Sequence, residues 1–577
     1  MRIEQGFQQQ PPPLLHPFLD DPILPVLVKR LFPPSSYATV VEELTRFGND
    51  INGYIHELGK YVEPPTLIQY DHFGQRIDQL KTSEGWRQLK QVATKEGMVS
   101  IAYDRANHGS LARILMFIKT CLWAGDSHGV TCPLAMTDGA ARVLELIGTC
   151  HMKEWLLPRL LSRDPQLAYT AGQWMTEACL VNLTPHPVYP NDTMQNGAPY
   201  RLSGVKWFSS ATDGQLALAL AQVPNQGLAL FVVPMPSADV ELFSPNTHLL
   251  SFQLRNGINI DRLKNKVGTH ALPTAELELE DTIGFLLIAP SQTQGTIKPN
   301  GVRTISPVLN ITRLHSAATS IGNLAKCLAI ARSYAQVRQV ADPTPGRVGG
   351  QALLVDVPLH TATLARVEVL RHALTHFLFG VVELLGASEA GTATNSERVR
   401  LRLLTPVLKA FAADRAVGGM EECMAALGGL GYMEETGIGR LIRDSLVEKI
   451  WEGTVNVLAL DMLRAMRGGD AIKAFCEWSR AIIARYPGPS INLIKRRLTL
   501  LESLNPSSCS SHARQALVLV AHLASASYLL QHAQWSRLEL DAVIAQRWIE
   551  EELEGKLVWD ADQDWNKMIV YQCTARL

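Results

Sequence analysis

The hydrophobic periodicity of this 577-residue chain changes twice. Apolar residues recur at helical spacing up to about residue 165, fall into short strand-like runs up to about residue 295, and then return to helical spacing. Blocks of helical and strand-like segments in a chain long enough for several domains are typical of an α+β protein. The sequence therefore predicts a helical part, a β part and a second helical part in that order.

Individual segments set the predicted boundaries. Thr274–Glu280 alternates strictly between apolar and polar residues, and several short runs near it predict a small antiparallel barrel or sandwich. Four long amphipathic segments after residue 300 predict an antiparallel four-helix bundle. Pro11–Pro13 and Pro33–Pro34 disfavour a helix before Ser35 and Ser36, which offer an N-cap. We expect an extended arm over 1–35, an α-helical domain over 36–165 with one helix over 76–96, a β-barrel domain over 166–295, a helical bundle over 296–469 and a C-terminal helical extension over 470–577.

Charge and cysteine usage restrict the class of protein. The net charge of −1 gives no overall field that would attract nucleic acid or an anionic membrane. No apolar run is expected to be long enough to span a membrane, which takes about 20 residues. The nine cysteines form no Cys-x-x-Cys pair, which favours reduced thiols in an intracellular compartment and no metal site. The chain ends in Ala575-Arg576-Leu577, which is similar to a Ser-Lys-Leu peroxisomal address, so we expect peroxisome or cytoplasm.

One carboxylate stands in unusual surroundings. Glu452 lies in Ile450-Trp451-Glu452-Gly453-Thr454, about twenty residues after the glycine-rich turn Leu427–Tyr432, within a mostly apolar helical region. An ionised Glu is rarely buried without a partner, and desolvation raises its pKa. Glu452 is therefore either a member of a structural ion pair or a base tuned toward neutral pH.

Familiar enzyme motifs are missing from the chain. It has no Gly-x-Gly-x-x-Gly opening a βαβ unit, no P-loop, no His-Glu-x-x-His and no Gly-x-Ser-x-Gly. Rossmann, P-loop, zincin and α/β-hydrolase assignments are disfavoured. What remains is a helical domain, a β-domain and a bundle that carries a Glu after a glycine-rich turn.

This order of parts resembles the acyl-CoA dehydrogenase superfamily, in particular its AidB-like branch, over about residues 5–470. The resemblance rests on five segments: Gly172–Glu177, Gly204–Ser210, Leu263–Gly268 with the strand and Ile283-Gly284 after it, Leu427–Tyr432 and Trp451–Thr454. It implies FAD as cofactor, a small-molecule substrate, and self-association as a homodimer or homotetramer.

The resemblance also implies roles for single residues. Glu452 would remove a proton α to a carbonyl while a hydride leaves the β carbon for the flavin. Arg338 would bind pyrophosphate, in the FAD of a partner subunit. The residues that would contact the cofactor are Met175, Thr176, Phe208, Ser210, Arg338, Gly428, Gly429, Thr454 and Asn456. Without the resemblance, Phe208 reads as strand core, Arg338 as a surface ion-pair residue and Thr176 as a strand hydroxyl.

Three departures from the family pattern bear on the substrate. Residues 178–185 replace a glycine-rich loop that wraps flavin and substrate, Ala341-Asp342 replaces a Phe-Gly pair, and Ala425 replaces a Gln or Glu. We therefore expect a specialised substrate, such as an intermediate of secondary metabolism, rather than a standard fatty acyl-CoA. Two alternatives stay open: a non-redox acid–base enzyme, for example an isomerase or cyclase, with flavin lost or idle, and an AidB-like nucleic-acid-binding protein, which the near-neutral charge disfavours.

Overall fold

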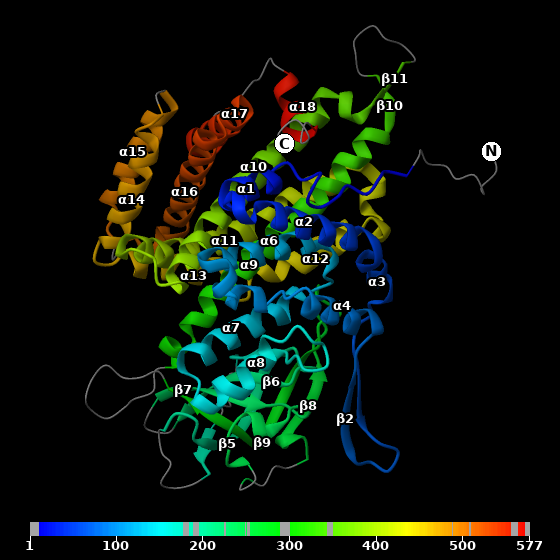
Figure 1. Cartoon of the computed structure of the whole chain (residues 1–577). Helices are drawn as coiled ribbons and strands as arrows, with labels where there is room; N and C mark the ends of the chain where they lie inside the picture. Colours follow the sequence, from blue (N-terminus) through cyan, green and yellow to red (C-terminus); the bar gives the residue numbers. More distant parts are fainter. Residues whose placement is uncertain are drawn as a thin grey trace, which may run out of the picture. The chain divides into compact units, whose positions relative to one another are not determined.

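The chain forms two compact units, each assembled from stretches that are separate in the sequence (Figure 1). The sheet unit comprises residues 55–104 and 127–315, and the helical unit comprises residues 1–54, 105–126 and 316–577. This computed structural model describes residues 11–176, 184–188, 195–223, 227–247, 250, 254–288, 301–342, 350–486, 489–506, 509–555 and 563–571.

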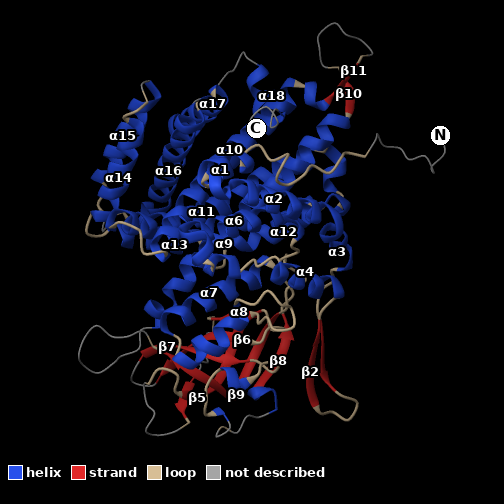
Figure 2. Ribbon diagram, viewed as in Figure 1, coloured by secondary structure: helices blue, strands red, loops and turns tan. Residues whose placement is uncertain are grey.

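Seven strands form the main sheet of the sheet unit, drawn in red in Figure 2. The order is β3-β6-β7-β9-β5-β4, with β8 also paired to β9. The pairs are antiparallel except β3 with β6, which is parallel. The predicted β-domain is confirmed with that one parallel pair as a difference. The strands are β3 (Ala171–Trp174), β4 (Thr184–Pro187), β5 (Pro199–Ser210), β6 (Leu216–Val223), β7 (Gly227–Pro234), β8 (Ile258–Leu263) and β9 (Thr274–Leu287).

Both faces of this sheet are buried, and the alternation along β6 explains how. Leu216 and Leu218 belong to one core cluster, whereas Ala217 and Ala219 belong to the other. Successive strand residues point to opposite faces, so the leucines pack on the side that also contains α7 residues. The alanines leave room on the second face for large aromatic rings such as Phe231.

A two-stranded hairpin stands where the sequence predicted the start of a helix. The expected helix over 76–96 is wrong in its first part, because β1 (Thr66–Tyr70) pairs with β2 (Arg76–Lys81). The turn is held by Asp71, whose Oδ1 accepts from the backbone N–H groups of Phe73 and Gln75 at 2.9 and 2.8 Å. The remaining helices of the sheet unit are α3 (His56–Leu58), α4 (Glu84–Lys95), α7 (Thr131–Ile147) and α8 (Leu157–Leu160).

The helical unit is built around two long helices. α10 (Pro358–Glu389) packs against α11 (Asn395–Ala426), α6 (Ala112–Trp123), α16 (Ala513–Ser536) and α18 (Gln563–Tyr571). α11 packs in turn against α12 (Ile438–Leu446), α13 (Val455–Met466) and α14 (Asp470–Ile483). α9 (Gly301–Val337) enters this unit at Ser316. The other elements are α1 (Leu24–Leu31), α2 (Pro34–Asp50), α5 (Arg105–His108), β10 (Gln339–Ala341), β11 (Gln351–Leu353), α15 (Pro489–Ser503) and α17 (Glu539–Trp548).

The N-terminal arm is more structured than predicted. It contains α1, whose first N–H groups at Ile23 and Leu24 donate to Asp21 Oδ1 at 2.8 Å each. The predicted cap at Ser35 is also wrong, since Pro33 occupies the N-cap and Pro34 the first helical position of α2. Proline is tolerated there because the first helical N–H has no intrahelical partner.

Among the described residues, two helical segments are long and apolar enough to span a membrane by composition, contrary to the expectation that no run would be. They are Pro358–Glu389 and Ser510–Ser536, and 94% and 83% of their apolar windows are buried within the protein. Such burial is typical of core helices in a bundle.

Candidate active site

The turn before α13 holds Glu452 in an uncommon backbone conformation. Glu452 has φ +57°, in the left-handed region, and Gly453 follows with φ +104°. Left-handed backbone is unfavourable for a residue with a Cβ and persists only where the surroundings enforce it. Glu452 is half-buried, and the three residues Glu452, Gly453 and Thr454 lead directly into the helix.

A buried lysine enforces this turn. Lys409 of α11 is 0% exposed, and its Nζ donates to the carbonyl oxygens of Trp451 and Gly453 at 2.6 and 2.8 Å. These are the carbonyls on either side of Glu452. The ammonium therefore fixes the backbone that presents the Glu452 side chain.

A second carboxyl lies one turn earlier. Glu448 is 2% exposed, and its Oε2 accepts from Ser316 Oγ at 2.6 Å and from the Trp451 indole Nε1 at 2.5 Å. Burial raises the pKa of Glu448 to about 8; the hydrogen bonds and Lys409 oppose that rise, and the charge of Glu452 adds to it. Glu448 and Glu452 thus form an interacting pair of carboxyl groups.

The predicted residues after the base lie on the first turn of α13. Thr454 is its N-cap and accepts from the backbone N–H of Val457 at 3.5 Å. Asn456 is an exposed residue of the same turn. Both residues are exposed at the start of the helix that follows Glu452.

The glycine-rich turn is exposed. Gly428 has φ +61°, and a Cβ built at Gly428 or Gly429 meets no atom within 4 Å. Gly431 differs, because a Cβ there would stand 2.0 Å from the Met424 carbonyl oxygen. Gly431 is required by packing, whereas Gly428 and Gly429 leave open backbone that a bound group can approach.

Arg338 lies where α9 ends and a short hairpin begins. Its carbonyl accepts from the backbone N–H of Leu354 at 2.9 Å, next to the β10–β11 pair. Arg338 as a whole is half-buried. Two positions that depart from the family pattern belong to the same unit: Asp342 directly follows β10 and donates its N–H to the Gly350 carbonyl at 2.9 Å, and Ala425 is exposed near the end of α11.

The sheet unit contains the other four predicted residues. Met175 and Thr176 follow β3, and the Thr176 carbonyl accepts from the Trp207 N–H at 3.0 Å, which ties this segment to β5. Gly172 permits that approach, because a Cβ there would stand 2.9 Å from the Ser210 carbonyl oxygen. Glu177 and residues 178–183 of the altered loop lie outside the described residues.

A β-bulge in β5 presents two aromatic rings. Lys206 pairs with Leu277 and Ser209 with Ala275, so Trp207 and Phe208 both stand opposite one residue of β9. Bulges re-aim side chains in this way. Phe208 is 37% and Trp207 43% exposed, so the reading of Phe208 as strand core does not hold.

Trp207 in this bulge and Ser210 just after it both contact polar side chains. Lys264 Nζ lies 3.1 Å from the Trp207 ring centroid and 2.5 Å from the Glu276 carboxylate. Ser210 is buried, and its hydroxyl lies 3.0 Å from that of Thr274. Ser210 therefore already has a hydroxyl partner within the sheet.

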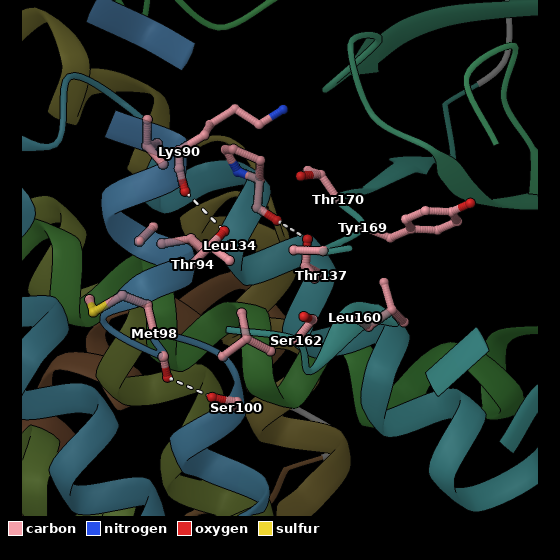
Figure 3. A pocket seen from close by; sticks show the side chains of 16 residues that line it. Lys90, Thr94, Met98, Ser100, Leu134, Thr137, Leu160, Ser162, Tyr169 and Thr170 are labelled. Atoms are coloured by element: carbon pink, nitrogen blue, oxygen red, sulfur yellow. Dashed lines mark hydrogen bonds between the residues drawn. The ribbon is translucent and has the colours of Figure 1, made fainter. Parts of the chain in front are cut away.

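A small pocket of about 30 Å³ lies elsewhere in the sheet unit (Figure 3). Its wall includes Lys90 and Thr94 of α4, Thr137 of α7, and Thr170 before β3. Thr137 Oγ1 donates to the Pro133 carbonyl at 2.7 Å and accepts from the Ala171 N–H at 3.0 Å, so it joins α7 to β3. The pocket contains none of the predicted site residues.

Sequence reasoning found Glu452 but missed the groups around it. Glu448 was signalled only by being four residues before Glu452, and nothing local marked Lys409 or Ser316. In the sheet unit it also missed Asp138, which accepts from the Tyr103 hydroxyl at 2.8 Å and lies 2.8 Å from His315 Nε2.

The described residues fit a flavin on two observations. In the sheet unit the exposed Phe208 ring offers an aromatic surface, and in the helical unit the backbone at Gly428 and Gly429 is open on the side where a Cβ would stand. The assignment of Phe208, Met175 and Thr176 to the ring system and of Arg338 to a phosphate stays a prediction.

Two family models match the chain. The acyl-CoA dehydrogenase C-terminal domain matches residues 299–467, and the N-terminal domain of the adaptive response protein AidB matches residues 13–165. Acyl-CoA dehydrogenase family member 11 of Caenorhabditis elegans is 39% identical over 481 residues, which cover 81% of this chain and 73% of that protein. AidB of Escherichia coli is 30% identical over 423 residues, which cover 71% of each.

Solved structures show the same architecture. Caenorhabditis elegans ACDH-11 in complex with C11-CoA superposes with a TM-score of 0.84 at 34% identity, covering 98% of this chain and 96% of that one. A Bacillus anthracis acyl-CoA dehydrogenase complexed with FAD superposes with a TM-score of 0.62 at 17% identity, covering 95% and 92%, which is a likeness of fold.

Proposed function

Because this chain belongs to the acyl-CoA dehydrogenase family, in the branch with an AidB N-terminal domain, we propose that it uses FAD and that Glu452 is its catalytic base. The observation that carries the proposal is the turn at Glu452. A carboxyl on a strained left-handed residue is held by a buried ammonium on both flanking carbonyls. Strain maintained by dedicated contacts is typical of a functional site.

The chemistry of the base follows from its position. Glu452 removes a proton from the carbon α to the carbonyl of a CoA thioester, which requires the carboxylate to be ionised and held close to that carbon. When bound, FAD supplies the acceptor for the hydride that leaves the β carbon. The half-buried setting of Glu452 limits the hydration of its carboxyl.

The substrate is proposed to be a specialised CoA thioester rather than a standard fatty acyl-CoA. The C11-CoA complex of ACDH-11 supports the thioester, since that protein shares the fold at 34% identity. The altered sequence over residues 178–185 supports the specialisation, because side chains stand where the family pattern has glycines. An intermediate of secondary metabolism is the class we favour.

The absorption spectrum of the purified protein tests this function first. We expect a flavin spectrum that bleaches anaerobically with at least one member of a panel of straight, branched and aromatic acyl-CoA thioesters. Bleaching by straight-chain thioesters as efficient as by all others would contradict the specialised substrate. An active protein without flavin absorption would instead favour the non-redox acid–base enzyme.

We propose that the protein forms a homodimer or homotetramer in which Arg338 reaches the cofactor of a partner subunit. Light scattering should give a mass at least twice 63.6 kDa.

We also propose a peroxisomal location set by Ala575-Arg576-Leu577, which lies outside the described residues. Removing the last three residues should release a fluorescent fusion into the cytoplasm, and an unchanged distribution would reject the address.

A further inference from the structure

The turn at Glu452 depends on contacts that come from three helices and converge on its two neighbours. Lys409 of α11 binds the carbonyls of Trp451 and Gly453. The indole of Trp451 is bound by Glu448, which in turn is bound by Ser316 of α9. These contacts hold the two residues on either side of Glu452.

We propose that Lys409 and Glu448 are positioning residues for Glu452: Lys409 holds the left-handed turn that aims its carboxyl, and Glu448 anchors Trp451 and sets the charge beside the base. The inference rests on the proposed function. It goes further in assigning two buried residues to the control of the base, neither of which contacts the reacting atoms.

Two charged groups of opposite sign act on Glu448. The charged groups that act on it are Lys409 and Glu452, and the remaining groups that bind it, Ser316 and Trp451, are neutral donors. Other charged side chains of the neighbouring helices are paired elsewhere: Arg440 with Asp444 at 3.2 Å, Arg443 with Glu434 at 2.8 Å, and Lys449 with Asp414 at 3.5 Å.

The sign of the pH effect follows from the like charges of the two carboxylates. At low pH Glu448 is neutral and does not repel the Glu452 carboxylate. Once Glu448 ionises, the two carboxylates repel each other. A carboxylate destabilised by a like charge takes up a proton more readily, so kcat should rise as Glu448 ionises, at a pH well above that of an ordinary glutamate.

Two substitutions separate the two roles. Glu448→Gln keeps an oxygen acceptor for Ser316 and Trp451 but removes the ionisable group, so kcat should lose its alkaline rise and become flat there. Lys409→Met removes the clamp and should lower kcat at least about tenfold with KM changed less than about twofold, because binding groups are untouched. Lys449→Met, at a partly exposed lysine paired with Asp414, is the matched control and should leave both constants unchanged.

A readout that does not use turnover makes the test independent of the proposed function. Infrared difference spectra over about pH 6–10 should show a protonated carboxyl that ionises near the alkaline end in the wild-type protein and is absent from Glu448→Gln. The same band in both proteins, the same kcat–pH profile in both, or an unchanged kcat in folded Lys409→Met would overturn the inference. If no acyl-CoA bleached the wild-type flavin, the proposed function would fail, while the infrared titration would still decide the assignment of Glu448.

Discussion

At the scale of single residues, the clamp on Glu452 outweighs the strain that it maintains. A left-handed non-glycine residue costs about 1–2 kcal/mol. Each hydrogen bond from a charged donor such as Lys409 contributes about 1.5–3 kcal/mol, and there are two. The backbone conformation of Glu452 is therefore stable in the folded protein without help from a ligand.

Glu448→Gln should change how stability depends on pH. The pKa of Glu448 is raised from 4.5 in the ordinary case to about 8 in the folded protein. Its neutral form therefore favours folding below about pH 4.5, and that contribution is lost as the pH rises through about 8. The difference in thermal midpoint, variant minus wild type, should grow from pH 5 to pH 9 in scanning calorimetry. A difference independent of pH would contradict the burial of an ionisable Glu448.

Local sequence could identify the base but not its supports. Glu452 is marked by its immediate neighbours, Trp451 and Gly453, so a short motif suffices. Lys409 and Ser316 meet this turn from 42 and more than 100 residues away, and only the packing of α9 and α11 brings them there. Contacts of that range leave no periodic signal in one sequence.

At the scale of elements, the contact of α10 with α16 depends on a glycine. A Cβ built at Gly380 would stand 2.1 Å from the ring of Tyr528, which also packs against Trp478 at 4.7 Å. Gly380→Ala should therefore destabilise the protein by about 1–3 kcal/mol through overpacking. Gly418→Ala in α11, where nothing lies within 4 Å of a built Cβ, should stabilise it by up to about 1 kcal/mol. Urea unfolding of both variants measures the contrast, and equal effects would reject it.

The C-terminal helices should be sensitive to acid through His522. Burial lowers the pKa of His522 to about 4, partly opposed by Glu552. Its stabilising contribution is present above about pH 6.5 and is lost as the pH falls through about 4. His522→Phe keeps a ring against Phe411 and Trp548 and should reduce the loss of thermal stability between pH 6.5 and pH 4.5. An identical acid response in the variant would show that another group is responsible.

Elements that depend on tertiary packing or on turn chemistry were the ones predicted wrongly. The long helices α9, α10 and α11 follow from periodicity alone. The β1–β2 hairpin was missed because the turn at Asp71 and Gly74, directly before the predicted helix, was not recognised, and residues 76–81 were counted with the helix that follows them. α1 was missed because Pro11–Pro13 and Pro33–Pro34 were taken to disfavour a helix over the whole arm, although α1 lies between them and its own Pro25 occupies an early position where proline is tolerated.

At the scale of the whole molecule, the predicted site residues divide between the two units. Met175, Thr176, Phe208 and Ser210 belong to the sheet unit, whereas the remaining residues belong to the helical unit: Arg338, Gly428, Gly429, Glu452, Thr454 and Asn456. The groups expected to hold the flavin ring are thus in one unit and the base is in the other. Binding of flavin and removal of the substrate proton should therefore be separable by mutation.

Anaerobic flavin bleaching in Glu452→Gln tests this central claim most directly. The variant should purify with the same flavin content as the wild type, and its bleaching by an active acyl-CoA should be slower by about 10²–10⁴-fold, the range of a general base. Glu434→Gln, which alters an exposed carboxylate paired with Arg443, should bleach at the wild-type rate. Bleaching of Glu452→Gln at the wild-type rate would contradict the assignment of Glu452 as the base.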